Sequence, residues 1–124
     1  MSKDAPILLI EEERDSSPYY KKILSRLNFN NITVINNLFD IHSTVGQLNP
    51  GLIIIDVVGK DESRALKILE RLEPFENKIP LIIISTSLNL DINRKLRTNS
   101  KADSFIKPLD VIQLAGSIYK LLAA

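Results

Sequence analysis

Five short apolar runs are the feature that most restricts what this chain can fold into. They lie at Ile7 to Ile10, Ile32 to Ile35, Leu52 to Ile55, Leu81 to Ile84 and, more weakly, Phe105-Ile106. Four of them are rich in isoleucine and show no alternation of apolar and polar residues. Such runs are typical of strands buried on both faces, as in a parallel sheet covered by helices. We therefore predict five strands of a parallel sheet.

The stretches between these runs carry apolar residues at helical spacing. The first helix is expected to begin at Ser17-Pro18, since Ser suits the N-cap and Pro the first helical position. The second is expected at about Leu38 to Leu48, the third is stopped by Pro74, the fourth lies near Asp91 to Asn99, and the last begins at Asp110. Strand and helix thus alternate five times, which predicts a doubly wound α/β fold with helices on both faces of the sheet.

Length and composition narrow the function classes. The 124 residues suit a single domain spanning positions 1–124, and the formal net charge of +1 gives no electrostatic reason to expect a nucleic acid or an anionic membrane as partner. There are no cysteines, which excludes thiol catalysis and thiolate zinc sites. The apolar runs are far shorter than the roughly 20 residues that a membrane-spanning helix needs. We expect a cytoplasmic protein.

Polar residues follow four of the five predicted strands. They are Glu11 and Glu12 after the first, Asp56 after the third, Ser85 after the fourth and Lys107 after the fifth. If the strand order is 2-1-3-4-5, these strands are contiguous and their carboxyl ends share one edge, where such folds bind ligands. Taken alone, Asp56 is as readily explained as a turn or cap residue, and the other residues are better explained as caps or surface residues. Their convergence on one edge favours a site.

This set of side chains suits phosphoryl transfer. Carboxylates without His or Cys companions favour a hard cation, and Mg²⁺ prefers one or two carboxylates together with water and phosphate oxygens. Asp56 is a candidate nucleophile that would form an acyl phosphate. Lys107 and Ser85 would contact phosphoryl oxygens, and phosphoryl transfer depends mostly on such positioning and charge stabilisation.

Four segments in this order resemble the receiver domain of two-component response regulators. They are ILLIEEE, LIIIDVV, PLIIIST and ADSFIKPLD, and the similarity covers nearly the whole chain. The resemblance implies a flavodoxin-like fold with the strand order 2-1-3-4-5. It also implies that Asp56 is the phosphoacceptor, that Glu11 and Glu12 match the acidic pair that holds Mg²⁺, and that Val58 lends its backbone carbonyl to the metal.

The same resemblance assigns the remaining roles. Ser85 matches the switch hydroxyl, Lys107 the conserved lysine of the family, and Pro108 the proline that follows it through a cis bond. The phosphoryl donor would be a phosphohistidine on a sensor histidine kinase or phosphotransfer protein. An output domain or effector would be contacted through the fourth helix, fifth strand and fifth helix. The domain would be no enzyme beyond its own Mg²⁺-dependent phosphorylation and dephosphorylation.

Two departures from the family pattern keep an alternative open. Both acidic positions are Glu where the family usually has Asp, and Phe105 lies two rather than three positions before Lys107. A shift of one residue in a strand moves a side chain to the opposite face, so Phe105 is either a displaced gate or a plain core aromatic. The alternative is a receiver-like docking module that works without phosphorylation.

A third class, a small α/β hydrolase or nucleotide-binding protein, has less support. The chain has four glycines and no glycine-rich phosphate loop. Val58 also stands where aspartate-nucleophile phosphatases have their second acid. Among the other polar and aromatic residues, we expect His42 to be a partly exposed helix residue, Tyr20 to be core and Tyr19 surface. The basic run at Arg94, Lys95, Arg97 and Lys101 is expected to be a solvated helix face.

Overall fold

The computed structural model describes residues 4–11, 17–57, 62–86 and 90–123. In this part of the chain, five strands form one parallel sheet in the order β2-β1-β3-β4-β5, which confirms the predicted fold class and strand order. The strands are β1 Ile7–Glu11, β2 Ile32–Ile35, β3 Leu52–Asp56, β4 Leu81–Ser85 and β5 Ala102–Ile106.

Within the described residues, five α-helices and two 3₁₀ turns connect and cover the strands. They are α1 Ser17–Arg26, η2 Leu38–Asp40, α2 Ile41–Leu48, α3 Glu62–Leu72, η3 Glu73–Phe75, α4 Leu90–Arg97 and α5 Val111–Ala123. The segment predicted as one helix at Leu38 to Leu48 is split, because Asn37 caps a separate 3₁₀ turn by accepting a hydrogen bond from Phe39 N. Asp110 caps α5 by accepting from the backbone N–H groups of Ile112 and Gln113 at 2.9 and 3.2 Å.

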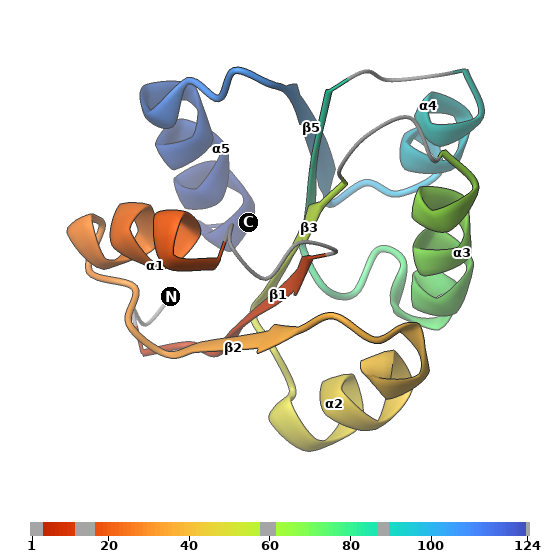
Figure 1. Ribbon diagram of the computed structural model, residues 1–124, viewed down its shortest axis with the longest axis horizontal. Coiled ribbons are helices and arrows are strands. Elements are labelled where there is room, and N and C mark those ends of the chain that lie inside the picture. The colour runs from red at the N-terminus through yellow and green to blue at the C-terminus, as the bar shows by residue number, and fades with distance from the viewer. Residues whose placement is uncertain (1–3, 12–16, 58–61, 87–89, 124) are drawn as a thin grey trace.

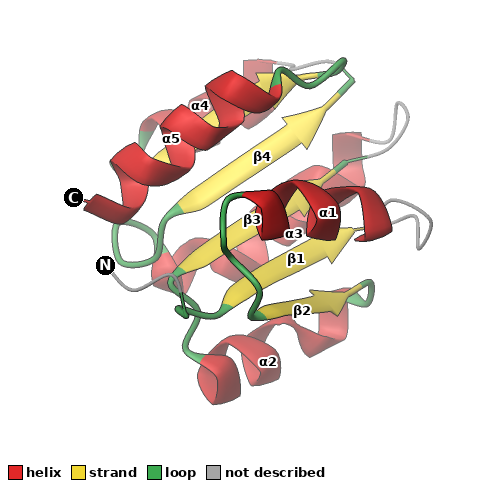
Figure 2. Cartoon of the chain, turned by 90° about the vertical axis from the view of Figure 1, so that its left-hand side faces the viewer, coloured by secondary structure: helices red, strands yellow, loops and turns green. Residues whose placement is uncertain are grey.

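The helices form two layers on opposite faces of the sheet. Figure 2 shows α1 and α5 in front of the strands, while α2, α3 and α4 lie behind them, and the same separation is visible in Figure 1. Successive residues of a strand point to opposite faces. Accordingly, Leu8 and Ile10 belong to the apolar core under α2, α3 and α4, whereas Ile7 and Leu9 belong to the core under α1 and α5.

The three central strands are buried along their whole length. Every residue of β1, β3 and β4 is buried, whereas β2 is half-buried and β5 has half-buried and exposed residues but none fully buried. This difference explains the sequence pattern, since a strand covered on both faces needs apolar side chains at every position. None of the described helices is long and apolar enough to cross a membrane.

Candidate functional site

Three buried polar side chains end the three central strands. Glu11, Asp56 and Ser85 are the last residues of β1, β3 and β4, and they are only 2%, 1% and 1% exposed. Glu11 and Asp56 are partners in the parallel register. The apolar strands thus carry these polar groups to one edge of the sheet, as the predicted strand order requires.

Lys107 joins this group from the end of β5. Its Nζ atom lies 2.6 Å from Oδ1 of Asp56, and its side chain is 28% exposed. The backbone N–H of Lys107 donates a 2.8 Å hydrogen bond to the carbonyl oxygen of Ser85, which ties the end of β5 to the end of β4. The Lys107–Pro108 peptide bond is cis, as the resemblance implied. Of the predicted site residues, Glu11, Asp56, Ser85 and Lys107 therefore converge on this edge.

Tyr20 is a residue of this site that the sequence interpretation missed. It lies on α1, is 3% exposed and belongs to the core under α1 and α5, as predicted for its ring. Its hydroxyl, however, interacts with Asp56. Burial, then the negative charge of Asp56 and a hydrogen bond to that carboxylate, raise the pKa of Tyr20 well above its usual value.

Among the described residues, the carboxylates at this edge fit a magnesium ion. Glu11 and Asp56 provide two carboxylates side by side, and Oδ2 of Asp56 is buried with no hydrogen-bond partner of ordinary geometry. Mg²⁺ takes one or two carboxylates with water and phosphate oxygens in such sites. Glu12 and Val58, the other predicted ligands, lie outside the described residues. Within the described residues, no group of three or more His, Cys, Asp or Glu side chains is placed so that it could hold a metal ion.

Phe105 is a core aromatic. It packs against the core under α1 and α5, whereas the preceding Ser104 lines a hollow with Asn93, Leu96 and Arg97 of α4. Of the two interpretations of Phe105, the structure thus favours the core aromatic over the displaced gate. The position three residues before Lys107, where the family's aromatic switch residue stands, is a serine on the α4 side of β5.

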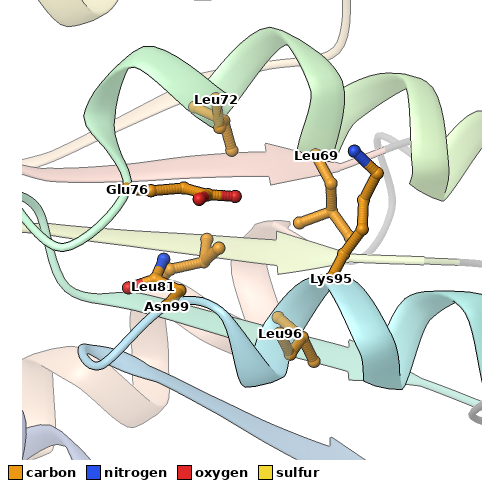
Figure 3. A pocket seen from close by; sticks show the side chains of 7 residues that line it. All are labelled: Leu69, Leu72, Glu76, Leu81, Lys95, Leu96 and Asn99. Carbon is orange, nitrogen blue, oxygen red and sulfur yellow. The ribbon is translucent and has the colours of Figure 1, made fainter.

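Two further expectations concern the helices away from this edge. His42 is exposed on α2, and its Nε2 lies 2.7 Å from the carbonyl oxygen of Arg71. The basic run is only partly a solvated helix face, because Lys95 of α4 forms an ion pair with Glu73 of η3, and Lys101 lies beyond the end of α4 at Arg97. Figure 3 shows the small pocket that lies beside this ion pair between α3 and α4, lined by Leu69, Leu72, Glu76, Leu81, Lys95, Leu96 and Asn99.

The sheet order and the polar groups at its carboxyl edge define a doubly wound α/β protein of the flavodoxin-like class. No protein-family model matches the sequence, and no curated protein matches it. Solved structures do match. A signal receiver domain of a two-component histidine kinase from Clostridium thermocellum has a TM-score of 0.76 and 24% identity, covering 98% of this chain and 99% of that chain.

Two further structures are similar over nearly the whole chain. A CheY-like response regulator from Mesorhizobium loti has a TM-score of 0.73 and 22% identity, covering 95% of this chain and 98% of that chain. A CheY-like receiver domain from Methylobacillus flagellatus has a TM-score of 0.72 and 18% identity, with the same coverage of 95% and 98%. The chain has the fold of response-regulator receiver domains.

Proposed function

We propose that this chain is a phosphoacceptor receiver domain of a phosphorelay, in which Asp56 takes a phosphoryl group from a phosphohistidine donor. One observation carries the proposal. The carboxylate of Asp56 is buried at the end of the central strand, paired with Lys107 Nζ at 2.6 Å and flanked by Glu11 and Ser85 at the ends of the neighbouring strands. A carboxylate held in this way is a nucleophile surrounded by the groups that a transferred phosphate needs.

In the proposed reaction, a carboxylate oxygen of Asp56 attacks the phosphorus atom of the donor. The bond from phosphorus to the imidazole nitrogen breaks, and its electron pair stays on the imidazole. Lys107 then pairs with a phosphoryl oxygen as well as with Asp56, and the hydroxyl of Ser85 donates a hydrogen bond to another. The reaction needs little else from the protein, because phosphoryl transfer depends mainly on alignment and charge neutralisation.

A magnesium ion would be held by Glu11, Glu12 and Asp56 together with the backbone carbonyl of Val58. Its chemistry would be to neutralise negative charge as the phosphoryl group approaches carboxylates that carry the same sign of charge. The paired carboxylates of Glu11 and Asp56 support this part of the proposal.

The proposed partners are a sensor histidine kinase or phosphotransfer protein and, on the output side, an effector or output domain. Apolar side chains at the end of β5 and the start of α5 support the output surface, since Ile106 is 55% and Ile112 is 83% exposed. The similar structure from Clostridium thermocellum is a receiver domain of a two-component histidine kinase, which supports kinases as partners. We expect the domain to act in the cytoplasm, as a signalling module and not as an enzyme with a separate substrate.

A second candidate is a receiver-like docking module that never carries phosphate. Two observations favour it: the acidic positions are both Glu, and Ser104 occupies the place of the family's aromatic switch residue. Such a module would bind its partner equally well with and without Mg²⁺.

The experiment that separates the two is phosphorylation by acetyl phosphate with Mg²⁺, followed by intact-protein mass spectrometry. We expect one added phosphoryl group on the wild type and on Asp40→Asn, whose exposed side chain makes no cap hydrogen bond. We expect none on Asp56→Asn. A wild type that gains no mass from acetyl phosphate or from phosphorylated imidazole would favour the docking module.

A further inference from the structure

An open hollow of about 520 Å³ lies between η2, α2 and α3, outside the site described above. It is lined by Leu38, Phe39, His42, Lys67, Glu70 and Arg71. Both η2 and α2 pack against α3. In Figure 2, α2 and α3 lie behind the sheet and α5 lies in front of it. The hollow is therefore in the opposite layer from α5, whose first residues belong to the proposed output surface.

Phe39 is an exposed aromatic residue at this hollow, with 76% of its surface accessible to solvent. The cap of η2 fixes its backbone, since Oδ1 of Asn37 accepts a 2.9 Å hydrogen bond from Phe39 N. The guanidinium carbon of Arg71 lies 4.9 Å from the centre of the ring, and Nε2 of His42 lies 2.7 Å from the carbonyl oxygen of Arg71. The ring and its surroundings are thus already ordered, and covering such a ring with a partner is favourable.

The charged side chains of the hollow decide what can cover it. Lys67 and Glu70 are both exposed and are three residues apart, so they share one face of α3. Within the part of the chain that the structure describes, neither forms an ion pair. An acidic partner would meet the carboxylate of Glu70, and a basic partner would meet Lys67 and Arg71, and like charges placed opposite each other disfavour binding. The hollow therefore fits a surface that carries both signs of charge, and the same surface on a second copy of the chain is one.

We propose that two copies of this chain associate through this face, related by a two-fold axis that sets their α3 helices antiparallel. Lys67 of each copy then lies next to Glu70 of the other, and the symmetry makes this contact twice. The Phe39 rings of both copies are covered at the same time. The contact is small, so the dimer is weak, with a Kd of about 0.1 mM. The proposal does not rest on phosphoryl transfer.

Sedimentation equilibrium of the full chain tests the association. Between about 10 μM and about 1 mM, we expect the average mass of the wild type to rise from that of a monomer toward that of a dimer. Phe39→Ala should stay monomeric over this range, and its circular dichroism should match the wild type because the side chain is 76% exposed. Ile112→Ala, which shortens an exposed side chain of α5, should associate as the wild type does.

Charge reversal tests the two-fold arrangement. Lys67→Glu places two carboxylates opposite each other in both contacts, and Glu70→Lys places two ammonium groups there. Each change should raise the Kd about tenfold or more. The double variant restores opposite charges in both contacts and keeps the net charge of the chain at +1, so it should associate like the wild type. Lys22→Glu, at an exposed position of α1, is the matched control and should have no effect.

Three results would overturn the proposal. The first is a wild type that stays monomeric at about 1 mM. The second is an association that Ile112→Ala weakens and Phe39→Ala does not, which would place the contact on α5. The third is a set of charge variants in which the single changes have no effect or the double variant associates no better than they do, which contradicts the pairing of Lys67 with Glu70. None of these proteins needs to be phosphorylated, so failure here leaves the proposed function untouched.

Discussion

Lys107 Nζ and Asp56 Oδ1 are 2.6 Å apart, so the residue after the edge strand β5 neutralises the last residue of the central strand β3. The two differ in their access to water, since the side chain of Asp56 is 1% and that of Lys107 is 28% exposed. The carboxylate therefore depends on the pair far more than the ammonium group does, because a buried charge without a partner is strongly unfavourable.

The first prediction follows from this asymmetry. Lys107→Met should lower the free energy of unfolding by about 3 kcal/mol, because it leaves a buried carboxylate uncompensated. Asp56→Asn should change the free energy of unfolding less, since the ammonium group of Lys107 that then lacks its partner has access to water. The double variant should be more stable than Lys107→Met alone, and urea denaturation of the four proteins measures this. A double variant less stable than Lys107→Met would contradict the argument.

The second prediction concerns the core. Ile54→Ala should lower the free energy of unfolding by about 4 kcal/mol, because Ile54 is 0% exposed at the middle of the central strand and its loss leaves a cavity. Ile112→Ala, which removes the same atoms from a residue 83% exposed, should change stability by less than about 0.5 kcal/mol. Similar values for both variants, measured by urea denaturation, would contradict the burial assigned to β3.

The third prediction concerns a pair of asparagines that joins the turn before β4 to the turn before β5. Oδ1 of Asn99 accepts hydrogen bonds from the backbone N–H groups of Asn77 and Lys101, at 3.2 and 3.0 Å. Oδ1 of Asn77 accepts one from Ser100 N at 2.6 Å. Asn99 is 7% exposed, so Asn99→Ala should lower the free energy of unfolding by about 2 kcal/mol through the donors it leaves without an acceptor.

The control for this variant is Asn30→Ala, at an exposed position before β2. Thermal denaturation should show a lower melting temperature for Asn99→Ala and nearly the wild-type value for Asn30→Ala. If both variants melt at the wild-type temperature, the backbone N–H groups of Asn77 and Lys101 form hydrogen bonds with water once Asn99 is truncated.

The fourth prediction is a dependence of stability on pH. The hydrogen bond to Glu73 raises the pKa of Lys95 above its usual value of 10.5. The folded protein therefore holds this proton more tightly than the unfolded chain, so the ion pair stabilises the fold below pH 10.5 and loses its effect as the pH rises further.

The pair is close to the surface, so the effect should be below about 1 kcal/mol. We expect Lys95→Met to be slightly less stable than the wild type at neutral pH, and this difference to shrink in strongly alkaline buffer. If thermal denaturation shows that the difference between the wild type and Lys95→Met grows with pH, the ion pair does not act in the direction predicted.

Four strands were predictable from sequence because their residues are almost all apolar, three of them (β1, β3 and β4) being buried along their whole length. Their isoleucine-rich runs begin where β1, β2, β3 and β4 begin. The fifth was predicted only at Phe105-Ile106, whereas β5 begins at Ala102. The missed residues are Ala102, Asp103 and Ser104 of the edge strand β5. At this edge a polar side chain is tolerated, and Asp103 accepts a hydrogen bond from Ser117 of α5. The other four strands were predictable from their apolar runs, including the half-buried β2.

The end of α4 shows a second limit of prediction. The apolar spacing extended this helix to Asn99, but it ends at Arg97. Thr98 donates its hydroxyl to the carbonyl oxygen of Lys95, and Asn99 accepts from the turns around it. The hydrogen bonds of Thr98 and Asn99 with the backbone compete with those of a further helical turn. The spacing of apolar residues carries no information about this competition.

The sequence predicted that Glu11, Asp56, Ser85 and Lys107 meet at this edge, but it did not predict that Tyr20 lies beside them. The strand order alone brings Glu11, Asp56 and Ser85 to one edge, and each follows an apolar run. The meeting of Tyr20 with Asp56 depends on how α1 lies on the sheet, which residue spacing does not determine. The roles of these residues in phosphoryl transfer stay predictions.

The full burial of β1, β3 and β4 has a consequence for motion. Hydrogen exchange is slowest where opening a strand exposes the most apolar surface, so the amides of Ile54 and Ile55 should exchange only when the whole domain unfolds. Asp56 is the next residue in the chain. Its backbone is therefore anchored to the most rigid segment of the fold, and a ligand that reaches it has to be accommodated by movement of the surrounding side chains.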